Sequence, residues 1–260
     1  MTKRRSNAKA RADSFNQFLT KNPIVEIPTE YNRSQKVFSI HDIKSIQPKT
    51  RNQKLVFDLW EDDYSILLQG FSGVGKTFIA TYLALNEILD PESPYEKIIY
   101  VKSNVSVRSP GFLPGTLEQK EEVLEMVYSE IFDELFKKKN QYKYMKESKL
   151  VEFRSTSFLR GLSFANSIVI FDEFQNANYE EISTCIQRIS TNSKLILCGD
   201  FMQNDLIRNR NDISGFHKAV SIIDTMPDFR KVSFEIDDCV RSEFVKSFLV
   251  AEYRYNETHK

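Results

Sequence analysis

One segment has the residue types and spacing of a loop that binds nucleotide phosphates. It reads Gly70-Phe71-Ser72-Gly73-Val74-Gly75-Lys76-Thr77. In such a G-x-x-x-x-G-K-T loop, glycines let successive backbone N–H groups turn inward around the phosphates, the lysine reaches the β- and γ-phosphates, and the threonine hydroxyl binds Mg²⁺. We therefore expect all of these residues to bind a nucleotide, with Lys76 also catalytic and Thr77 also a metal ligand.

Two adjacent carboxylates follow an apolar run further along the chain. Asp172 and Glu173 come directly after Ser167–Phe171, a pattern typical of the Walker B strand of nucleotide hydrolases. Asp172 is expected to hold the Mg²⁺, and Glu173 to orient and deprotonate a water that attacks the γ-phosphorus. The simpler alternative is a strand that ends in a charged turn. The phosphate loop upstream favours the catalytic interpretation.

A third polar group follows the apolar run Leu195–Cys198, where Asp200 and Gln203 come after Gly199. A glutamine amide can donate to a γ-phosphate and accept from the attacking water, so Gln203 is a candidate sensor of the γ-phosphate. The alternative is an ordinary polar turn.

Gln53 lies upstream of the phosphate loop, in a stretch that begins at Pro48. A side-chain amide can pair in two ways with an adenine edge, so Gln53 is a candidate for selecting ATP. On spacing alone it could equally be a residue at the start of a helix, on a solvated face.

These groups need elements that bring them together, and the chain alternates apolar strands with amphipathic helices from Ile46 onward. This alternation predicts an α/β fold with a mostly parallel sheet covered on both faces, whose ligands bind beyond the carboxyl ends of the strands. The expected strands are Ser65–Gln69, Lys97–Lys102, Leu150–Arg154, Ser167–Asp172, Lys194–Gly199 and Lys231–Ile236. The expected helices are Thr77–Leu89, Leu117–Lys138, Tyr179–Ile189, Ser214–Asp224 and Ser242–Tyr255.

Length and composition suit one large domain with an N-terminal extension. The chain has 260 residues, 41% of them hydrophobic, and a formal net charge of zero. Residues 1–46 are polar and begin with a basic cluster, so we interpret them as a solvated tail or arm, with contact to nucleic-acid phosphate as the alternative. Residues 47–260 are expected to form the ATPase domain.

The cysteines and the hydropathy pattern indicate the cellular compartment of the protein. Cys185, Cys198 and Cys239 are far apart and lack the spacing of a zinc or redox site. No apolar run is long enough to span a membrane, and no apolar stretch follows the basic N-terminal residues as a secretory signal would require. These features predict a cytoplasmic, reduced protein without a structural metal or a membrane partner.

Several segments, in one order, resemble the PhoH-like family of P-loop ATPases, which are relatives of the superfamily 1 helicase motor. The segments are Asn52-Gln53, Gly70–Thr77, Gly111–Gly115, Phe158–Gly161, Phe171–Asn176, Gly199–Leu206 and Val240-Arg241. The resemblance covers roughly residues 46–255. It departs from the usual family pattern at Phe71-Ser72 and at Phe174, where smaller residues are common.

The resemblance implies a three-layer RecA-like core that binds and hydrolyses ATP with Mg²⁺. It also implies helicase-like work on RNA or another single-stranded nucleic acid. In such a core the Lys194–Gly199 strand lies between the strand before the phosphate loop and the Walker B strand. That placement would aim Asp200 and Gln203 at the γ-phosphate.

The transition state at the γ-phosphate needs positive charge beyond Lys76 and Mg²⁺, and helicase motors take an arginine from a second RecA-like domain. This chain has room for one such domain. The candidate arginines are Arg241, then Arg160, then Arg108. Either an arginine acts within its own chain, or a neighbouring copy supplies it, and the second possibility predicts a homo-oligomer with composite ATP sites.

Two other functional classes compete with an ATP hydrolase. A non-hydrolysing ATP-binding switch or assembly module would not need Glu173 and Gln203. A GTPase or small-molecule kinase is disfavoured because the chain has no Asn-Lys-x-Asp guanine motif and its second carboxylate is not kinase-like.

Overall fold

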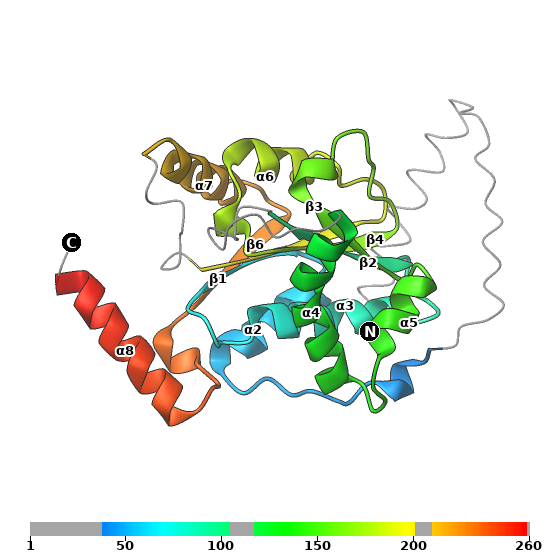
Figure 1. Cartoon of the computed structure of the whole chain (residues 1–260), viewed down its shortest axis with the longest axis horizontal. Coiled ribbons are helices and arrows are strands. Elements are labelled where there is room, and N and C mark those ends of the chain that lie inside the picture. Colours follow the sequence, from blue (N-terminus) through cyan, green and yellow to red (C-terminus); the bar gives the residue numbers. More distant parts are fainter. Residues whose placement is uncertain (1–37, 104–116, 201–209, 259–260) are drawn as a thin grey trace.

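A parallel sheet of six strands forms the centre of the computed structural model, which describes residues 38–103, 117–200 and 210–258 (Figure 1). The strand order is β3-β2-β4-β5-β1-β6, and every pairing is parallel. The strands are β1 (Ser65–Gly70), β2 (Lys97–Lys102), β3 (Val151–Ser155), β4 (Ser167–Asp172), β5 (Lys194–Gly199) and β6 (Phe229–Phe234). The predicted α/β fold with a mostly parallel sheet is confirmed.

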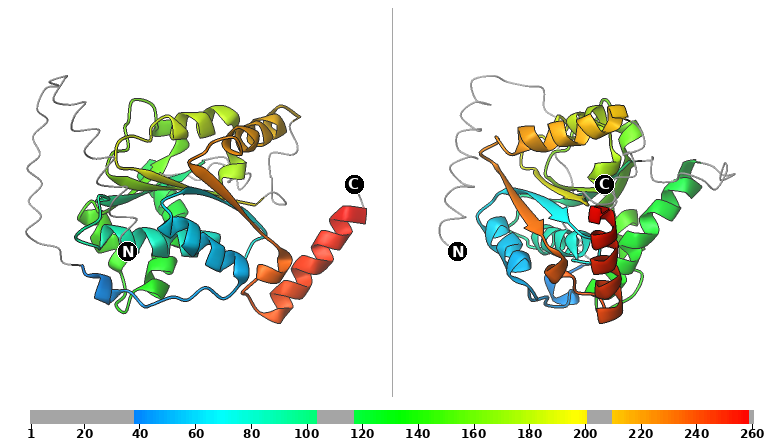
Figure 2. Two further views of the ribbon diagram at one scale, coloured as in Figure 1. Left: turned by 180° about the vertical axis from the view of Figure 1, so that it is seen from behind. Right: turned by 90° about the vertical axis from the view of Figure 1, so that its left-hand side faces the viewer.

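Helices cover both faces of this sheet and make three layers (Figures 1 and 2). One face carries α2 (Arg51–Glu61), α3 (Lys76–Ile88), α4 (Leu117–Leu135) and α5 (Gln141–Glu147). The other carries α6 (Tyr179–Ile186) and α7 (Arg210–Ile223). The last helix, α8 (Glu243–Thr258), stands away from the sheet in Figure 1. Short 3₁₀ turns complete the fold at η1 (Ile40–Asp42), η3 (Thr156–Phe158), η4 (Phe174–Asn176) and η6 (Ile236–Asp238).

The alternation of side chains along each strand divides the core into two. On β1, Ile66 and Leu68 pack towards α2 and α3, whereas Leu67 packs towards α6 and α7, and all three are fully buried. Successive residues of a strand point to opposite faces, so a strand with a helix layer on each side must be apolar throughout. This explains the continuous apolar runs in the sequence.

Strand β5 lies between β1 and β4. Gln69 pairs with Gly199 on one side of β5, and Phe171 pairs with Leu197 on the other. Because the strands are parallel, the phosphate loop after β1, the carboxylates after β4 and Asp200 after β5 meet at one edge of the sheet. The strand placement expected from the family resemblance is confirmed.

Some elements differ from the sequence-based expectation. β6 begins at Phe229, two residues earlier than expected, because it pairs with β1 from Ser65 onward. It ends at Phe234 because Glu235 then caps η6. Helices α2 and α5 were not expected. In α2 the buried stripe includes the polar Gln53 beside Val56 and Trp60, which weakens the apolar periodicity.

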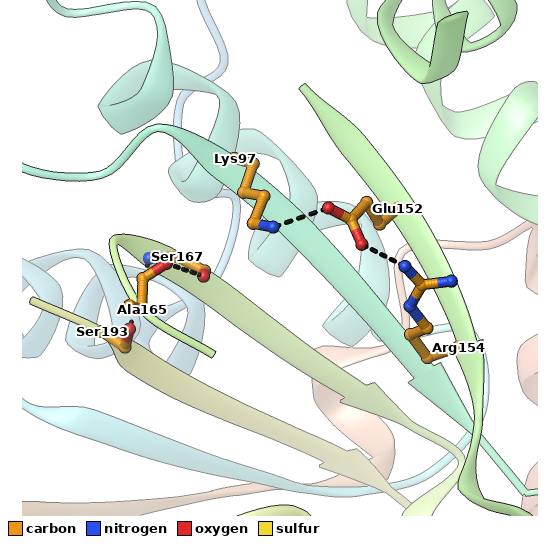
Figure 3. Close-up of polar contacts among 6 residues, drawn as sticks. All are labelled: Lys97, Glu152, Arg154, Ala165, Ser167 and Ser193. Carbon is orange, nitrogen blue, oxygen red and sulfur yellow. Dashed lines mark hydrogen bonds and ion pairs between the residues drawn. The ribbon is translucent and has the colours of Figure 1, made fainter. Parts of the chain in front are cut away.

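The edge strand β3 is tied to β2 by charged side chains (Figure 3). Lys97 Nζ lies 2.6 Å from one carboxylate oxygen of Glu152, and Arg154 Nη2 lies 2.6 Å from the other. Charged side chains on an edge strand also discourage pairing with another sheet. We interpret this group as structural.

The described part of the N-terminal region packs on the domain. Phe38 and Ile43 are buried, and Ile43 forms a β-bridge with Phe136 just after α4. The rest of the expected tail, residues 1–37, lies outside the described residues. Within the portion of the chain that is described, every helix is too short or too polar to traverse a lipid bilayer.

Candidate nucleotide site

The phosphate loop begins where β1 ends, and its glycines adopt backbone conformations that other residues rarely take. Gly70 has a φ of 137°, and a Cβ there would lie 2.3 Å from the carbonyl oxygen of Phe234. Gly73 and Gly75 have φ values of 79° and 85°. Gly75 is also the residue that precedes α3, so the loop leads directly into a helix N-terminus, where N–H groups and the helix dipole favour an anion.

Lys76 folds back over this loop. Its ammonium donates to the carbonyl oxygens of Gly70 and Phe71, each at 2.7 Å. Burial lowers its pKa, while the charges of Asp200 and the neighbouring carboxylates oppose that change. The lysine therefore lies inside the loop, where the oxygens of a phosphate would compete for the same donors.

Asp172 receives two hydroxyl groups at the end of β4. Thr77 Oγ1 donates to Asp172 Oδ1 at 2.7 Å, and the Tyr128 hydroxyl donates to Asp172 Oδ2 at 3.3 Å. Asp172 and Thr77 come from segments 95 residues apart, yet their oxygens are in contact. Oxygen ligands on a short carboxylate and a hydroxyl suit a hard cation such as Mg²⁺, which completes its shell with water and phosphate oxygens.

Buried aromatic residues hold the Tyr128 hydroxyl in place. The Tyr128 ring stacks on Tyr100 with a centroid distance of 4.0 Å, and the Tyr100 hydroxyl pairs with Thr81 of α3 at 2.9 Å. Both tyrosines are fully buried. Asp172 is thus linked to α3 directly through Thr77 and to α4 through Tyr128, a contact that the sequence did not suggest.

Glu173 lies beside Asp172 in an unusual backbone conformation. Its φ of 50° and ψ of 38° are left-handed, which costs a non-glycine residue about 1 kcal/mol or more. Burial and, secondarily, the charge of Asp172 raise the pKa of the Glu173 carboxyl, against a hydrogen bond from Gln175. A strained conformation at a sheet edge where charged groups meet is typical of a functional residue.

Gln175 connects two strand ends. Its Nε2 donates to Glu173 Oε2 at 2.6 Å, and its Oε1 accepts the backbone N–H of Asp200 at 3.0 Å. The sequence assigned no role to Gln175, although it belongs to the Phe171–Asn176 segment that carries the family resemblance. That segment, and the position of Gln175 two residues after a carboxylate, are the clues that the sequence offers.

Gln53 lies under the phosphate loop. Its Nε2 donates to the Val74 carbonyl at 3.1 Å, and its Oε1 accepts the Lys49 backbone N–H at 2.7 Å. The side chain is 5% exposed. Gln53 therefore supports the loop from the first turn of α2, which begins at the capping residue Thr50. The expected contact with adenine stays a prediction.

Among the candidate arginines, Arg241 lies beside the phosphate loop of its own chain. A Cβ built on Gly73 would be 2.9 Å from Arg241 Cγ, and the Val240 N–H donates to the Gly73 carbonyl at 3.2 Å. Arg160 instead follows the edge strand β3, and three strands separate β3 from β1. Arg108 and the candidate sensor Gln203 lie outside the described residues.

The sequence matches a known protein family over most of its length. The sequence profile described as PhoH-like protein matches residues 45–253. The chain belongs to the PhoH-like family. The expected family is therefore confirmed, and the parallel sheet described above agrees with the fold expected for it.

Curated PhoH-like relatives are distant and longer. A PhoH-like protein of Mycobacterium leprae is 29% identical over 82% of this chain and 60% of its own length. Protein PhoH of Escherichia coli is 29% identical over 74% of this chain and 53% of its own length. The chain thus spans little more than half the length of these relatives.

Solved structures with a similar arrangement are more distant still. The large terminase of a thermophilic bacteriophage, solved with ADP, has a TM-score of 0.44 and 12% identity over 81% of this chain and 50% of its own. The Hef helicase domain of Pyrococcus furiosus has a TM-score of 0.40 and 14% identity over 70% of this chain and 38% of its own.

The tight contact between β5 and η4 gives a stability prediction. A Cβ on Gly199 would lie 2.5 Å from the Phe174 ring, so Gly199→Ala should lower the free energy of unfolding by about 1–3 kcal/mol. Phe174→Ala should lower it by about 3–5 kcal/mol by leaving a cavity, but it also makes room for the alanine. In urea titrations, the double variant should lose at least about 1 kcal/mol less than the two single losses combined.

Gly161→Ala is the control, because a Cβ at Gly161 meets nothing within 4 Å, and its cost comes from the backbone φ of 81° and not from crowding. Its effect should add to that of Phe174→Ala. If the effects of Gly199→Ala and Phe174→Ala were also additive, the proposed crowding between position 199 and the Phe174 ring would be contradicted.

Proposed function

We propose that this chain binds ATP with Mg²⁺, hydrolyses it, and couples hydrolysis to work on RNA or another single-stranded nucleic acid. One observation carries the hydrolytic part. The loop hydroxyl of Thr77 and the carboxylate of Asp172 are 2.7 Å apart, and a second carboxylate, Glu173, is the next residue of the chain. Phosphate binding alone would require the loop but not the second carboxylate.

The proposed roles follow from these positions. Backbone N–H groups of residues 70–77 and the start of α3 would hold the phosphates, and Thr77 with Asp172 would hold Mg²⁺, which neutralises charge on the phosphate oxygens. Glu173 would accept a proton as the oxygen of water bonds to the γ-phosphorus. The bond from the γ-phosphorus to the bridging oxygen then breaks, which leaves ADP and phosphate.

Three further residues complete the proposal. Lys76 would exchange the carbonyl oxygens of Gly70 and Phe71 for the β- and γ-phosphates. Gln53 would contact adenine with its second amide hydrogen and the second lone pair of its oxygen. Gln203, after β5, keeps its proposed role as sensor of the γ-phosphate.

Two substitutions separate binding from hydrolysis. Lys76→Ala should abolish ATP turnover because it removes the cation at the β- and γ-phosphates. Glu173→Gln should lower kcat by about 100-fold or more while the Kd for ATP stays within about threefold, because it removes a base and leaves the loop intact. Phosphate release and fluorescent-ATP titration measure the two quantities. Equal turnover by the wild type and Glu173→Gln would favour a non-hydrolysing switch.

Coupling to a nucleic acid has its own test. ATP turnover should rise when single-stranded RNA or DNA is added, and the stimulation should weaken between about 50 and 200 mM salt because phosphate contacts release counterions. Lys76→Ala protein should stay inactive with either polymer. If neither polymer changes the wild-type rate, the nucleic-acid part of the proposal is wrong.

Self-association is also proposed, with α8 as the contact to a second copy. Phe244 is 81% exposed and Phe248 is 60% exposed, one helical turn apart. Further along α8, Tyr253 meets the phosphate-loop residue Phe71 edge to face at 5.6 Å. A second copy that covers this helix would therefore lie next to the nucleotide site.

Light scattering tests this proposal, and the ATP turnover of mixed variants tests which copy supplies the arginine. Phe244→Asp with Phe248→Asp should convert an oligomer to a monomer, whereas Tyr144→Asp, on the distant helix α5, should not. Mixing Lys76→Ala with Arg241→Ala restores turnover only if Arg241 acts on a neighbouring copy. Because Arg241 lies at Gly73 of its own chain, we expect no restoration. A monomeric wild type would contradict self-association.

A further inference from the structure

A fully buried glutamine joins the proposed catalytic carboxylate to the neighbouring strand end. Gln175 has no exposed area and lies in η4, directly after β4. Its amide nitrogen donates to Glu173 Oε2 at 2.6 Å, and its amide oxygen accepts the Asp200 N–H at 3.0 Å. The two contacts use opposite ends of one planar group, so the positions of Glu173 and Asp200 depend on each other.

The surrounding packing leaves the amide little freedom. A Cβ on Gly199 would lie 2.5 Å from the Phe174 ring and 2.9 Å from Gln175 Oε1. Backbone hydrogen bonds from Asn176 to Glu173 and from Ala177 to Phe174 close the η4 turn. With glycine at position 199 the end of β5 lies close against η4, and this brings the Asp200 N–H to the amide oxygen.

The bridge also determines which carboxylate oxygen is engaged. Gln175 binds Glu173 Oε2, so a water would be activated at Oε1. Glu173 has two side-chain torsions that could carry its carboxylate away, and its left-handed backbone places it at a sharp turn. A buried donor that holds one oxygen reduces this freedom and fixes the direction in which the other oxygen points.

We propose that Gln175 is a positioning residue, which couples the Glu173 carboxylate to the backbone at the end of β5. This inference rests on the proposed ATP hydrolysis. Under it, the backbone at Asp200 cannot shift without moving the group that activates water. A displacement of the backbone after β5 would therefore be transmitted to the Glu173 carboxylate through the Gln175 side chain.

A double-mutant cycle tests this role. Gln175→Met keeps the side-chain length but removes both hydrogen bonds. It should lower kcat for ATP by about tenfold or more and leave KM within about twofold, because the group that it positions acts in the chemical step. In a Glu173→Gln background, the same change should alter the rate by less than about twofold. Single-turnover assays with enzyme in excess keep the slow variants measurable.

Two further variants distinguish the hydrogen bonds of Gln175 from the packing of its side chain. Gln175→Glu keeps the volume and an acceptor for the Asp200 N–H, but it places a second carboxyl group against Glu173, and two carboxyl groups this close share one proton. Because the shared proton leaves Glu173 less free to take a proton from water, this variant should slow turnover at least as much as Gln175→Met. Gln187→Met is the control for the glutamine-to-methionine change. Gln187 is exposed, and its amide nitrogen donates to the hydroxyl of Ser183, away from the proposed site. It should leave both kcat and KM unchanged.

The outcomes distinguish this inference from the proposed function. A wild-type chain that hydrolyses no ATP would overturn the proposed function and, with it, any catalytic role for Gln175. An active wild type with equal fold losses in both backgrounds would overturn the role of Gln175 alone, since its effect would then not pass through Glu173. Wild-type turnover by Gln175→Glu would do the same, and it also decides the matter if Gln175→Met fails to fold.

Discussion

The pairing of β5 with both β1 and β4 is the constraint on which the rest of the site depends. The phosphate loop and the two carboxylates come from strands that are not neighbours, and one intervening strand separates them by roughly 10 Å at the usual spacing. The Thr77 hydroxyl and the Asp172 carboxylate bridge that separation at 2.7 Å. A slip in register between β4 and β5 would move these groups apart, because Asp172 is the last residue of β4 and Asp200 directly follows β5.

Two side chains that shape this edge, Asp172 and Gln175, are buried together with their hydrogen-bond partners. Asp172 is 4% exposed and receives hydroxyls from α3 and α4, whereas Gln175 is fully buried and uses both ends of its amide. An unpaired polar group in such surroundings would cost about 1–3 kcal/mol. The pairing therefore makes the fold depend on the same contacts that position the proposed reaction, so substitutions here are expected to affect stability as well as turnover.

The sequence predicted the sheet and its carboxyl edge well, because buried parallel strands have continuous apolar runs and the loop motif has its own spacing. It predicted the proximity of Thr77 to Asp172 through fold class, since nothing local links them. It did not reveal Tyr128 or Gln175. Tyr128 lies among the core residues of an amphipathic helix, and only the tertiary packing shows that its hydroxyl reaches Asp172. Helix α2 was missed because its buried face includes Gln53.

The inward position of Lys76 has a consequence for how the site meets its ligand. With two carbonyl oxygens around its ammonium, the lysine has a substitute for the solvation that burial takes away. Under the proposed function, phosphate oxygens would replace this pair of carbonyl oxygens around the ammonium. The positive-φ glycines and the lysine contacts define the shape of the loop, so little of the binding free energy would be spent on ordering it.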